Sequence, residues 1–188
     1  MFEKIKEKNV LKSKWSYMII GAVLTMIVLS GIMVIAMKTS SDDLMINEHK
    51  SKFDTIEETV QAIYDGVDAF NTAHSEEIEE VGAWSVLDIL NVTDKIVAKH
   101  PEYSDMKETK ILSLCNAKIA YDMLGEDGRR KISTMMPCAI GVYEKADGIY
   151  VSGFDMHIFA MIMPSDIGNV LKVVAEADDE ILSHVCID

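Results

Sequence analysis

Apolar and polar positions divide this chain into one long uncharged run followed by a series of short amphipathic segments. Residues 15–37 contain no charged side chain. A helix of that length rises roughly 34 Å, slightly more than the hydrocarbon core of a bilayer. A cleaved signal peptide has a shorter apolar region, and a buried helix is seldom apolar on every face. The run therefore predicts one transmembrane helix that is retained as an uncleaved signal anchor.

The charges on either side of the run predict its orientation. Residues 1–14 hold five lysines against two glutamates, whereas the residues after Met37 hold 13 basic and 29 acidic side chains. Basic flanks stay on the cytoplasmic side of a membrane. We therefore expect a cytoplasmic basic tail at residues 1–14 and an extracytoplasmic remainder, which in a bacterium or archaeon means the periplasm or the cell exterior. Residues 38–52 are mostly polar and are predicted to form a solvated tether.

Residues 53–188 are long enough for one globular domain, and their patterns alternate between helix and strand. Helical spacing of apolar residues predicts helices from Asp54 or Thr55 to about residue 71, over 95–99, over 117–124, and from Ser165 or Asp166 to Val185. Runs rich in β-branched residues predict strands over 83–92, 109–115, 135–144 and 149–154. Asp147-Gly148 between the last two strands indicates a hairpin.

This order of elements predicts the fold class. It favours an α+β domain with a mostly antiparallel sheet covered by helices, preceded by one transmembrane helix. The net charge of the whole chain is −13. Affinity for nucleic acid rests largely on neutralising phosphates with Lys and Arg, so we expect no nucleic-acid partner.

Two short motifs in the middle of the domain carry a family resemblance. The first is Asn-x-Lys at Asn116 to Lys118, directly after an apolar strand, and the second is Pro-x-x-x-x-Val-Tyr-Glu at Pro137 to Glu144. With these motifs, residues 53–185 resemble the domain-of-unknown-function 302 family. Many members have Pro in the middle of Asn-x-Lys, whereas this chain has Ala117. It therefore resembles a side branch with Cys before the Asn and after the Pro.

The resemblance implies a compact α+β domain similar to the TATA-binding-protein-like folds, often paired as a homodimer. It implies no established reaction. Links of the family to sulfur or redox metabolism are associations that come with the resemblance.

Three cysteines in an extracytoplasmic domain permit a disulfide with one thiol left over. Cys115 ends one predicted strand and Cys138 begins another. On neighbouring antiparallel strands these thiols would lie at the same end of the sheet, where they could bond or share a ligand. A parallel crossover would place them at opposite ends, and the sequence leaves both arrangements open. Each cysteine can also be a small buried hydrophobe, and Cys186 near the chain end is expected to be exposed.

Thioether and imidazole groups gather around the second motif, at Met135, Met136, Met156, His157, Met161 and Met163. Together with thiolates these donors favour Cu(I) or, through Met and His, a haem iron. The candidate metal ligands are Cys115, Met136, Cys138 and His157. Packing of a methionine-rich core is the favoured alternative, because no Cys-x-x-Cys-His motif and no repeated Met-x-x-Met series is present.

The chain carries none of the common hydrolase, zinc-protease or phosphate-binding motifs, so the sequence does not support an ordinary enzyme. The function it favours is an accessory or binding protein on the membrane, associated with redox or sulfur metabolism. The alternatives are a thiol-redox, copper or haem carrier that uses Cys115 and Cys138, and a structural subunit of a larger membrane complex. The candidate ligand or redox residues are Cys115, Asn116, Lys118, Met136, Cys138, Met156 and His157.

Overall fold

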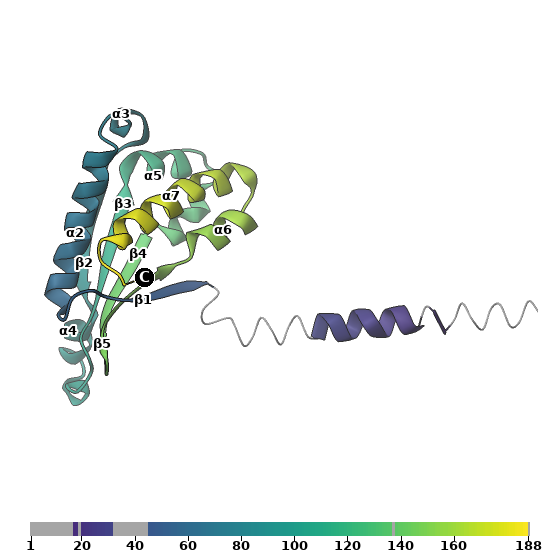
Figure 1. Ribbon diagram of the computed structural model, residues 1–188, viewed down its shortest axis with the longest axis horizontal. Helices are drawn as coiled ribbons and strands as arrows, with labels where there is room; N and C mark the ends of the chain where they lie inside the picture. The colour runs from purple at the N-terminus through teal and green to yellow at the C-terminus, as the bar shows by residue number, and fades with distance from the viewer. Residues whose placement is uncertain (1–16, 19, 32–44, 137, 188) are drawn as a thin grey trace, which may run out of the picture. The chain divides into compact units, whose positions relative to one another are not determined.

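The computed structural model describes residues 17–18, 20–31, 45–136 and 138–187 (Figure 1). The chain forms two compact units, Met1–Asp42 and Asp43–Asp188, and each is described by itself. In the first unit, residues 17–18 and 20–31 are helical, and the large apolar side chains among them are exposed.

No helix within the described residues is both long enough and apolar enough to cross a membrane. The predicted span, residues 15–37, includes positions 15–16, 19 and 32–37, which lie outside the described residues. The basic tail at residues 1–14 lies outside them as well. The membrane anchor and its orientation therefore stay predictions.

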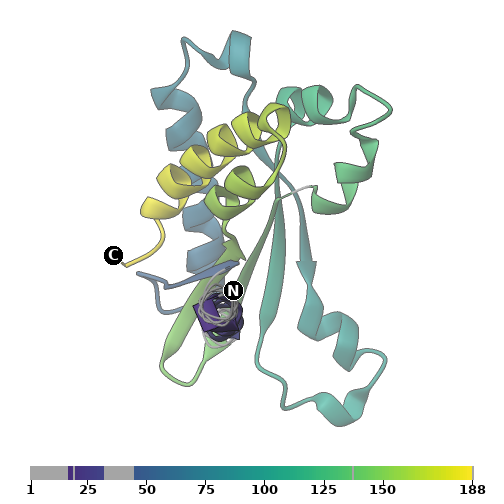
Figure 2. The ribbon, with the colours of Figure 1, turned by 90° about the vertical axis from the view of Figure 1, so that its right-hand side faces the viewer.

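The second unit combines helices with a five-stranded antiparallel sheet (Figures 1 and 2). Its elements in chain order are β1 (Ile46–Lys50), α2 (Ile56–Ala73), α3 (Ile78–Val81), β2 (Trp84–Asn91), α4 (Val92–Val97), η1 (Pro101–Tyr103), β3 (Thr109–Asn116), α5 (Ala117–Leu124), η2 (Arg130–Met135), β4 (Cys138–Lys145), β5 (Gly148–Phe154), α6 (Met156–Ile162) and α7 (Ser165–Ser183). The predicted α+β class is confirmed, and the further likeness to TATA-binding-protein-like folds stays a prediction.

The sheet has the strand order β1-β5-β4-β3-β2, and all neighbouring strands are antiparallel. β1 forms one edge, with Ile46 opposite Phe154 and Lys50 opposite Tyr150. Here the sequence analysis was wrong, because it assigned these residues to a solvated tether. A short edge strand is held by its backbone hydrogen bonds to one neighbour, so it can be polar and leave little apolar pattern to detect.

One face of the sheet packs against helices, and the core lies between them. Side chains that alternate along the central strands point into this core and are fully buried, namely Leu112, Leu114, Val142 and Val151. They meet Ile63 of α2 and Ile181 of α7, which are also fully buried. The two helices touch closely, since a Cβ placed on Gly66 of α2 would lie 2.7 Å from the carbonyl oxygen of Ile181.

The side chains that alternate with these core positions point to the opposite face of the sheet. Among the described residues on that face, Cys115, Tyr143, Tyr150 and Ser152 are only half-buried. The two faces of the sheet therefore differ in burial. A side chain on β3, β4 or β5 reaches the helices only if it points to the same face as the core residues.

The buried side chain of Asn116 joins three segments at the end of β3. Its Nδ2 donates to the carbonyl oxygens of Val81 and Gly82 at 3.0 and 2.8 Å. Its Oδ1 accepts from the backbone N–H groups of Lys118 and Ile119, both at 3.1 Å, and so caps α5. An amide offers two donors and two acceptor positions, so all four are used. Asn116 of the Asn-x-Lys motif therefore has a structural role.

Several local expectations need correction. The structure adds α6, which the sequence analysis did not predict, and it places Met135 in η2 although a strand was expected there. α4 begins at Val92, earlier than the predicted start at residue 95, because Asn91 provides the cap through a 3.0 Å bond from the Asp94 N–H. α7 begins at Ser165, one of the two predicted starts, and ends at Ser183. The other predicted helices and strands are confirmed to within a few residues.

The four bonds of Asn116 generate a stability prediction. Asn116→Ala should lower the free energy of unfolding by about 2 to 3 kcal/mol, because it removes a helix cap and leaves two part-buried carbonyl oxygens without their donors. Asn91→Ala is the matched control, since it removes a single exposed cap bond and should cost about 1 kcal/mol. Urea denaturation of both variants measures the difference. Equal losses would contradict the role given to Asn116.

Candidate functional site

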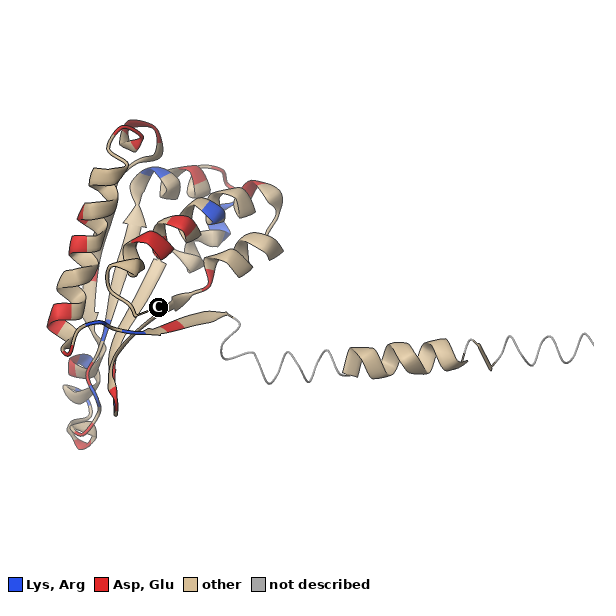
Figure 3. Ribbon diagram, in the orientation of Figure 1, with Lys and Arg blue, Asp and Glu red and all other residues tan. Residues whose placement is uncertain are grey.

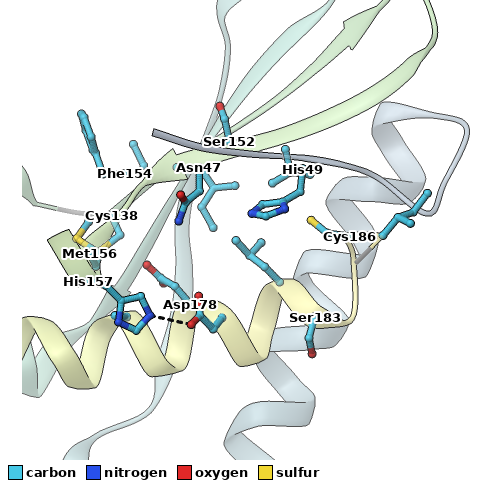
Figure 4. A pocket seen from close by; sticks show the side chains of 18 residues that line it. Asn47, His49, Cys138, Ser152, Phe154, Met156, His157, Asp178, Ser183 and Cys186 are labelled. Atoms are coloured by element: carbon cyan, nitrogen blue, oxygen red, sulfur yellow. Dashed lines mark hydrogen bonds and ion pairs between the residues drawn. The ribbon is translucent and has the colours of Figure 1, made fainter. Parts of the chain in front are cut away.

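A pocket of about 280 Å³ opens on the helix-covered face of the domain. Its walls come from β1, β4, β5, α6, α7 and the residues that follow α7. Figure 4 shows Cys138, Met156 and His157 towards one end, His49 and Cys186 towards the other, and Asn47 between them. The pocket therefore gathers side chains from both ends of the domain's sequence.

Apolar side chains form much of the pocket wall, among them Ile140, Val151, Phe154, Met156 and Leu182. Polar side chains also reach it, namely Asn47, His49, His157, Asp178, Asp179 and Ser183. Small-molecule sites commonly combine a mostly apolar wall with a few placed polar groups. The composition of this pocket is of that kind.

Asp178 brings a buried polar atom without a partner to the pocket. Its Oδ1 atom is buried and has no hydrogen-bond partner within the described parts of the chain. Burial of the carboxyl, with a smaller contribution from neighbouring Asp179, raises the pKa of Asp178 to about 7. A buried carboxyl without a donor is costly to ionise, so a ligand that donates a hydrogen bond here would gain more than it would in water.

His157 stands at the start of α6 and faces α7. Its Nε2 lies 2.8 Å from Oδ2 of Asp179, and both side chains are more than half exposed. The hydrogen bond to Asp179 raises the pKa of His157. The pair balances its own charge when the imidazole is protonated, which leaves Asp178 as the acid in the pocket without a partner.

Two of the three thiols line the pocket, and all three are free. Burial raises the pKa of Cys138 to about 12, with a smaller contribution from Asp178. Burial also raises the pKa of Cys186 to about 11, so the expectation of an exposed thiol at Cys186 is wrong. At neutral pH both groups are thiols, which are weaker nucleophiles and metal ligands than thiolates.

Cys115 lies away from this pocket. β3 and β4 are antiparallel neighbours, so Cys115 and Cys138 do lie at the same end of the sheet. However, Cys138 stands opposite Leu114, and residues directly opposite each other share a face. Cys115 follows Leu114 and therefore points to the other face. The sheet itself separates the two thiols, which contradicts the idea of a bonded or jointly ligating pair.

The remaining predicted site residues have structural surroundings. Asn116 uses its amide within the fold, and Nζ of Lys118 donates to the backbone oxygen of Glu80. Met136 follows η2 and packs against the core. Of the predicted residues, only Cys138, Met156 and His157 line the pocket.

The proposed soft-metal site is not assembled in the described residues. They contain no group of three or more His, Cys, Asp or Glu side chains placed to hold a metal ion. Cys115 is on the other face of the sheet, and Met136 does not line the pocket. The geometry thus brings together only part of the copper or haem ligand set expected from the sequence.

Sequence reasoning missed Asn47 and His49, because it placed both in the tether. It also missed Asp178, although a signal was present. Asp178 follows Val174 by four residues and precedes Ile181 by three, so it lies on the apolar stripe of α7. An acid on the buried stripe of a helix is unusual enough to be a candidate site residue.

The raised pKa of Asp178 generates a prediction about stability and pH. The pKa of about 7 in the folded protein exceeds the usual value of 3.8 for an aspartate, so the wild-type protein should lose stability as the pH rises from about 4 to about 7. Asp178→Asn removes the ionisation and should raise the free energy of unfolding by about 2 to 4 kcal/mol at pH 8. The gain should shrink towards pH 4.

Chemical denaturation of both proteins across this pH range measures the effect. Glu176→Gln is the matched control on the exposed side of the same helix, and its difference from wild type should not follow this pH profile. A pH-independent difference for Asp178→Asn would mean that the carboxyl is already satisfied in the folded protein.

The positions of the thiols generate a second prediction. Mild oxidation of the folded protein should not link Cys115 to Cys138, because the sheet lies between them. A maleimide reagent should label Cys115 before Cys138, because burial raises the pKa of Cys138 to about 12, and buried Cys186 should react only after unfolding. Peptide mapping by mass spectrometry gives the order of labelling. A rapidly formed Cys115–Cys138 disulfide would refute the strand register.

Comparison with known proteins places the domain in a family. None of the curated proteins compared matches the chain. The crystal structure of an uncharacterized conserved DUF302 protein from Bacillus stearothermophilus is similar, with a TM-score of 0.59 and 16% identity over 77% of this chain and 99% of that chain. At this identity the likeness shows the fold alone. The model of the family "Domain of unknown function DUF302" matches residues 47–185, and the chain therefore belongs to that family.

Proposed function

We propose that this chain is a membrane-anchored, extracytoplasmic ligand-binding protein. Its ligand is a small molecule with a protonated amine and an apolar body, bound in the pocket with the amine at Asp178. The observation that carries the proposal is the buried Oδ1 atom of Asp178, which has no partner among the described residues.

The unpaired oxygen and the negative charge of the Asp178 carboxylate are the reasons for proposing an amine. A protonated amine both donates hydrogen bonds and carries a positive charge, so it relieves the unpaired acceptor and lowers the pKa of the carboxyl. A neutral donor would satisfy the oxygen but would leave the ionised acid without a counter-charge. A carboxylate or phosphate ligand would place a second negative charge beside Asp178.

The rest of the pocket fits such a ligand. Asn47 and His49 of β1 supply further acceptors, while Ile140, Val151 and Leu182 supply apolar surface for a hydrocarbon group. The volume of about 280 Å³ is just below the range of roughly 300 to 1,000 Å³ for sites that take drug-sized ligands. The pocket therefore suits a small amine.

The net negative charge of the chain also favours a positively charged ligand. The residues after Met37 carry 13 basic and 29 acidic side chains, and a negative surface raises the local concentration of cations. Steering of this kind affects the association rate and weakens with salt.

The placement of the protein rests on its sequence. The uncharged run at residues 15–37, with the basic residues 1–14 before it, supports a single-pass anchor with a cytoplasmic amino terminus. An amine-binding domain on the outer side of the membrane would bind ligand from the periplasm or the cell exterior.

The other functions expected from the sequence gain less support. A thiol pair at Cys115 and Cys138 needs both groups on one face of the sheet, and a copper or haem site needs ligands that the described residues do not bring together. Links to redox or sulfur metabolism, a homodimer and membership of a larger membrane complex stay predictions.

Binding of a defined amine tests the proposal. Full-length protein in phosphatidylcholine nanodiscs should bind benzylamine, and benzyl alcohol and benzoate should bind far more weakly. Affinity should rise by about 10- to 30-fold from pH 5.5 to pH 8, because the ionised fraction of a carboxyl with a pKa of about 7 rises by that factor. Saturation-transfer NMR and calorimetric titration measure binding.

Asp178→Asn is the critical variant and should lose both the preference for the amine and its pH dependence. Glu176→Gln removes an exposed acid from the same helix and should leave both unchanged. Benzylamine binding that is equally strong in Asp178→Asn would overturn the role of the pocket.

A further inference from the structure

Exposed apolar side chains gather where the domain begins. Their exposed fractions are 40% at Met45, 46% at Ile46, 50% at Phe154, 75% at Met161 and 63% at Ile162. With half-buried Phe159 they are called the apolar patch below. These residues come from the start of β1, the end of β5 and α6, which lie on the same side of the domain in Figures 1 and 2.

Contacts between neighbours join most of this patch, and Met161 adjoins it in sequence through Ile162. Ile46 stands directly opposite Phe154 in the sheet. The backbone N–H of Asp155 donates to the carbonyl oxygen of Met45 at 3.0 Å, which ties the first described residue of the domain to the segment that enters α6. The rings of Phe154 and Phe159 meet edge to face with centroids 5.7 Å apart. Ile162 follows Phe159 by three residues and so lies on the same side of α6.

The composition of α6 is unusual for a surface helix. Its seven residues include no Lys, Arg, Asp or Glu, and the helix is drawn entirely in the neutral colour in Figure 3. Only Met156 and Ala160 of this helix are buried. Soluble proteins seldom leave a contiguous apolar surface uncovered, and such surfaces commonly mark contacts with proteins or membranes. α6 therefore presents apolar groups to something other than the core of its own domain.

The position of the patch in the chain identifies its partner. Only residues 38–44 connect the end of the predicted membrane span with Met45. Seven residues reach at most about 25 Å even when fully extended, so the patch cannot lie far from the lipid surface. Apolar and aromatic side chains partition into the boundary between headgroups and acyl chains. This step rests on the membrane anchor of the proposed function.

We infer that the apolar patch docks on the outer lipid surface, with Phe154, Met161 and Ile162 entering the headgroup boundary. The patch residues carry no charge, whereas the chain as a whole has a net charge of −13. Zwitterionic lipid is therefore the favoured surface, because anionic lipid would repel the acidic remainder of the domain. Docking should depend little on salt. It would hold the domain close to the membrane in one orientation.

Lipid photolabelling of the full-length chain tests this inference. The chain is placed, one copy per disc, in phosphatidylcholine nanodiscs that contain a lipid with a diazirine near the headgroup end of its acyl chain. After illumination, mass spectrometry maps the labelled residues. Met161 and Ile162 should be labelled on the order of tenfold more than Leu87, which is 61% exposed on the opposite edge strand of the sheet.

Variants separate docking from simple proximity to the membrane. Met161→Ser with Ile162→Ser should reduce labelling at Phe154 by about tenfold, since two apolar side chains no longer partition into lipid. Leu87→Ser should leave it unchanged. Thermal unfolding followed by circular dichroism checks that both variants are folded.

The outcomes also separate this inference from the anchor. Absence of label in residues 15–37 would overturn the anchor itself. Label in residues 15–37 without label in the patch would overturn docking while leaving the anchor in place. If the patch is unlabelled and Met161 instead crosslinks between copies in proteoliposomes, a second chain covers the patch and the lipid contact is refuted.

Discussion

Helix α7 is held between two neighbours at points where a side chain would not fit. A Cβ on Gly66 of α2 would lie 2.7 Å from the carbonyl oxygen of Ile181, and a Cβ on Gly168 of α7 would lie 2.5 Å from that of Ala160 in α6. These approaches fix both the position and the rotation of α7. Val174 and Ile181 then face the core, and Asp178 on the same stripe faces the pocket beside Cys138. This fixed rotation holds the buried Oδ1 atom of half-buried Asp178 at the pocket.

This constraint links the chemistry of the pocket to the stability of the domain. A carboxyl that is buried without a donor opposes folding whenever it is ionised, and the rest of the core has to offset that cost. Strain of this kind is typical of binding sites, where polar groups are satisfied only when a ligand is present. Nearby, His157 and Asp179 are hydrogen-bonded to each other, so neither is left without a partner.

Much of the fold could be predicted from the sequence, because the elements concerned bury a regular apolar pattern. The long helices α2 and α7 were predicted correctly for that reason, whereas the hairpin at Asp147-Gly148 was predicted from its turn residues. β1 could not be predicted in this way, since it is a polar edge strand that depends on a neighbour more than 90 residues further along the chain. α6 was missed because its exposed apolar residues do not form the one-sided pattern of a soluble helix.

The candidate site was predicted only in part, and the reason is again geometric. Cys138, Met156 and His157 were identified by their chemistry and do line the pocket. Nothing in the amino-acid sequence indicated that their expected partner, Cys115, lies on the other face of the sheet. The distinction depends on a single residue of register between β3 and β4, which decides the face of the sheet that each thiol occupies.

The first and last segments of the domain are joined by backbone hydrogen bonds beside the pocket. Ser51 forms a bridge with Cys186, and the backbone N–H groups of Lys52 and Ile187 donate to Val185 and Lys50 at 2.9 Å each. One wall of the cavity is thus made from the first and last segments of the domain. Local unfolding of an edge strand requires less energy than opening a central strand. Loosening of this pairing would move Asn47 and His49 away from the other pocket residues, so the affinity for a ligand is coupled to how firmly the first and last segments of the domain are joined.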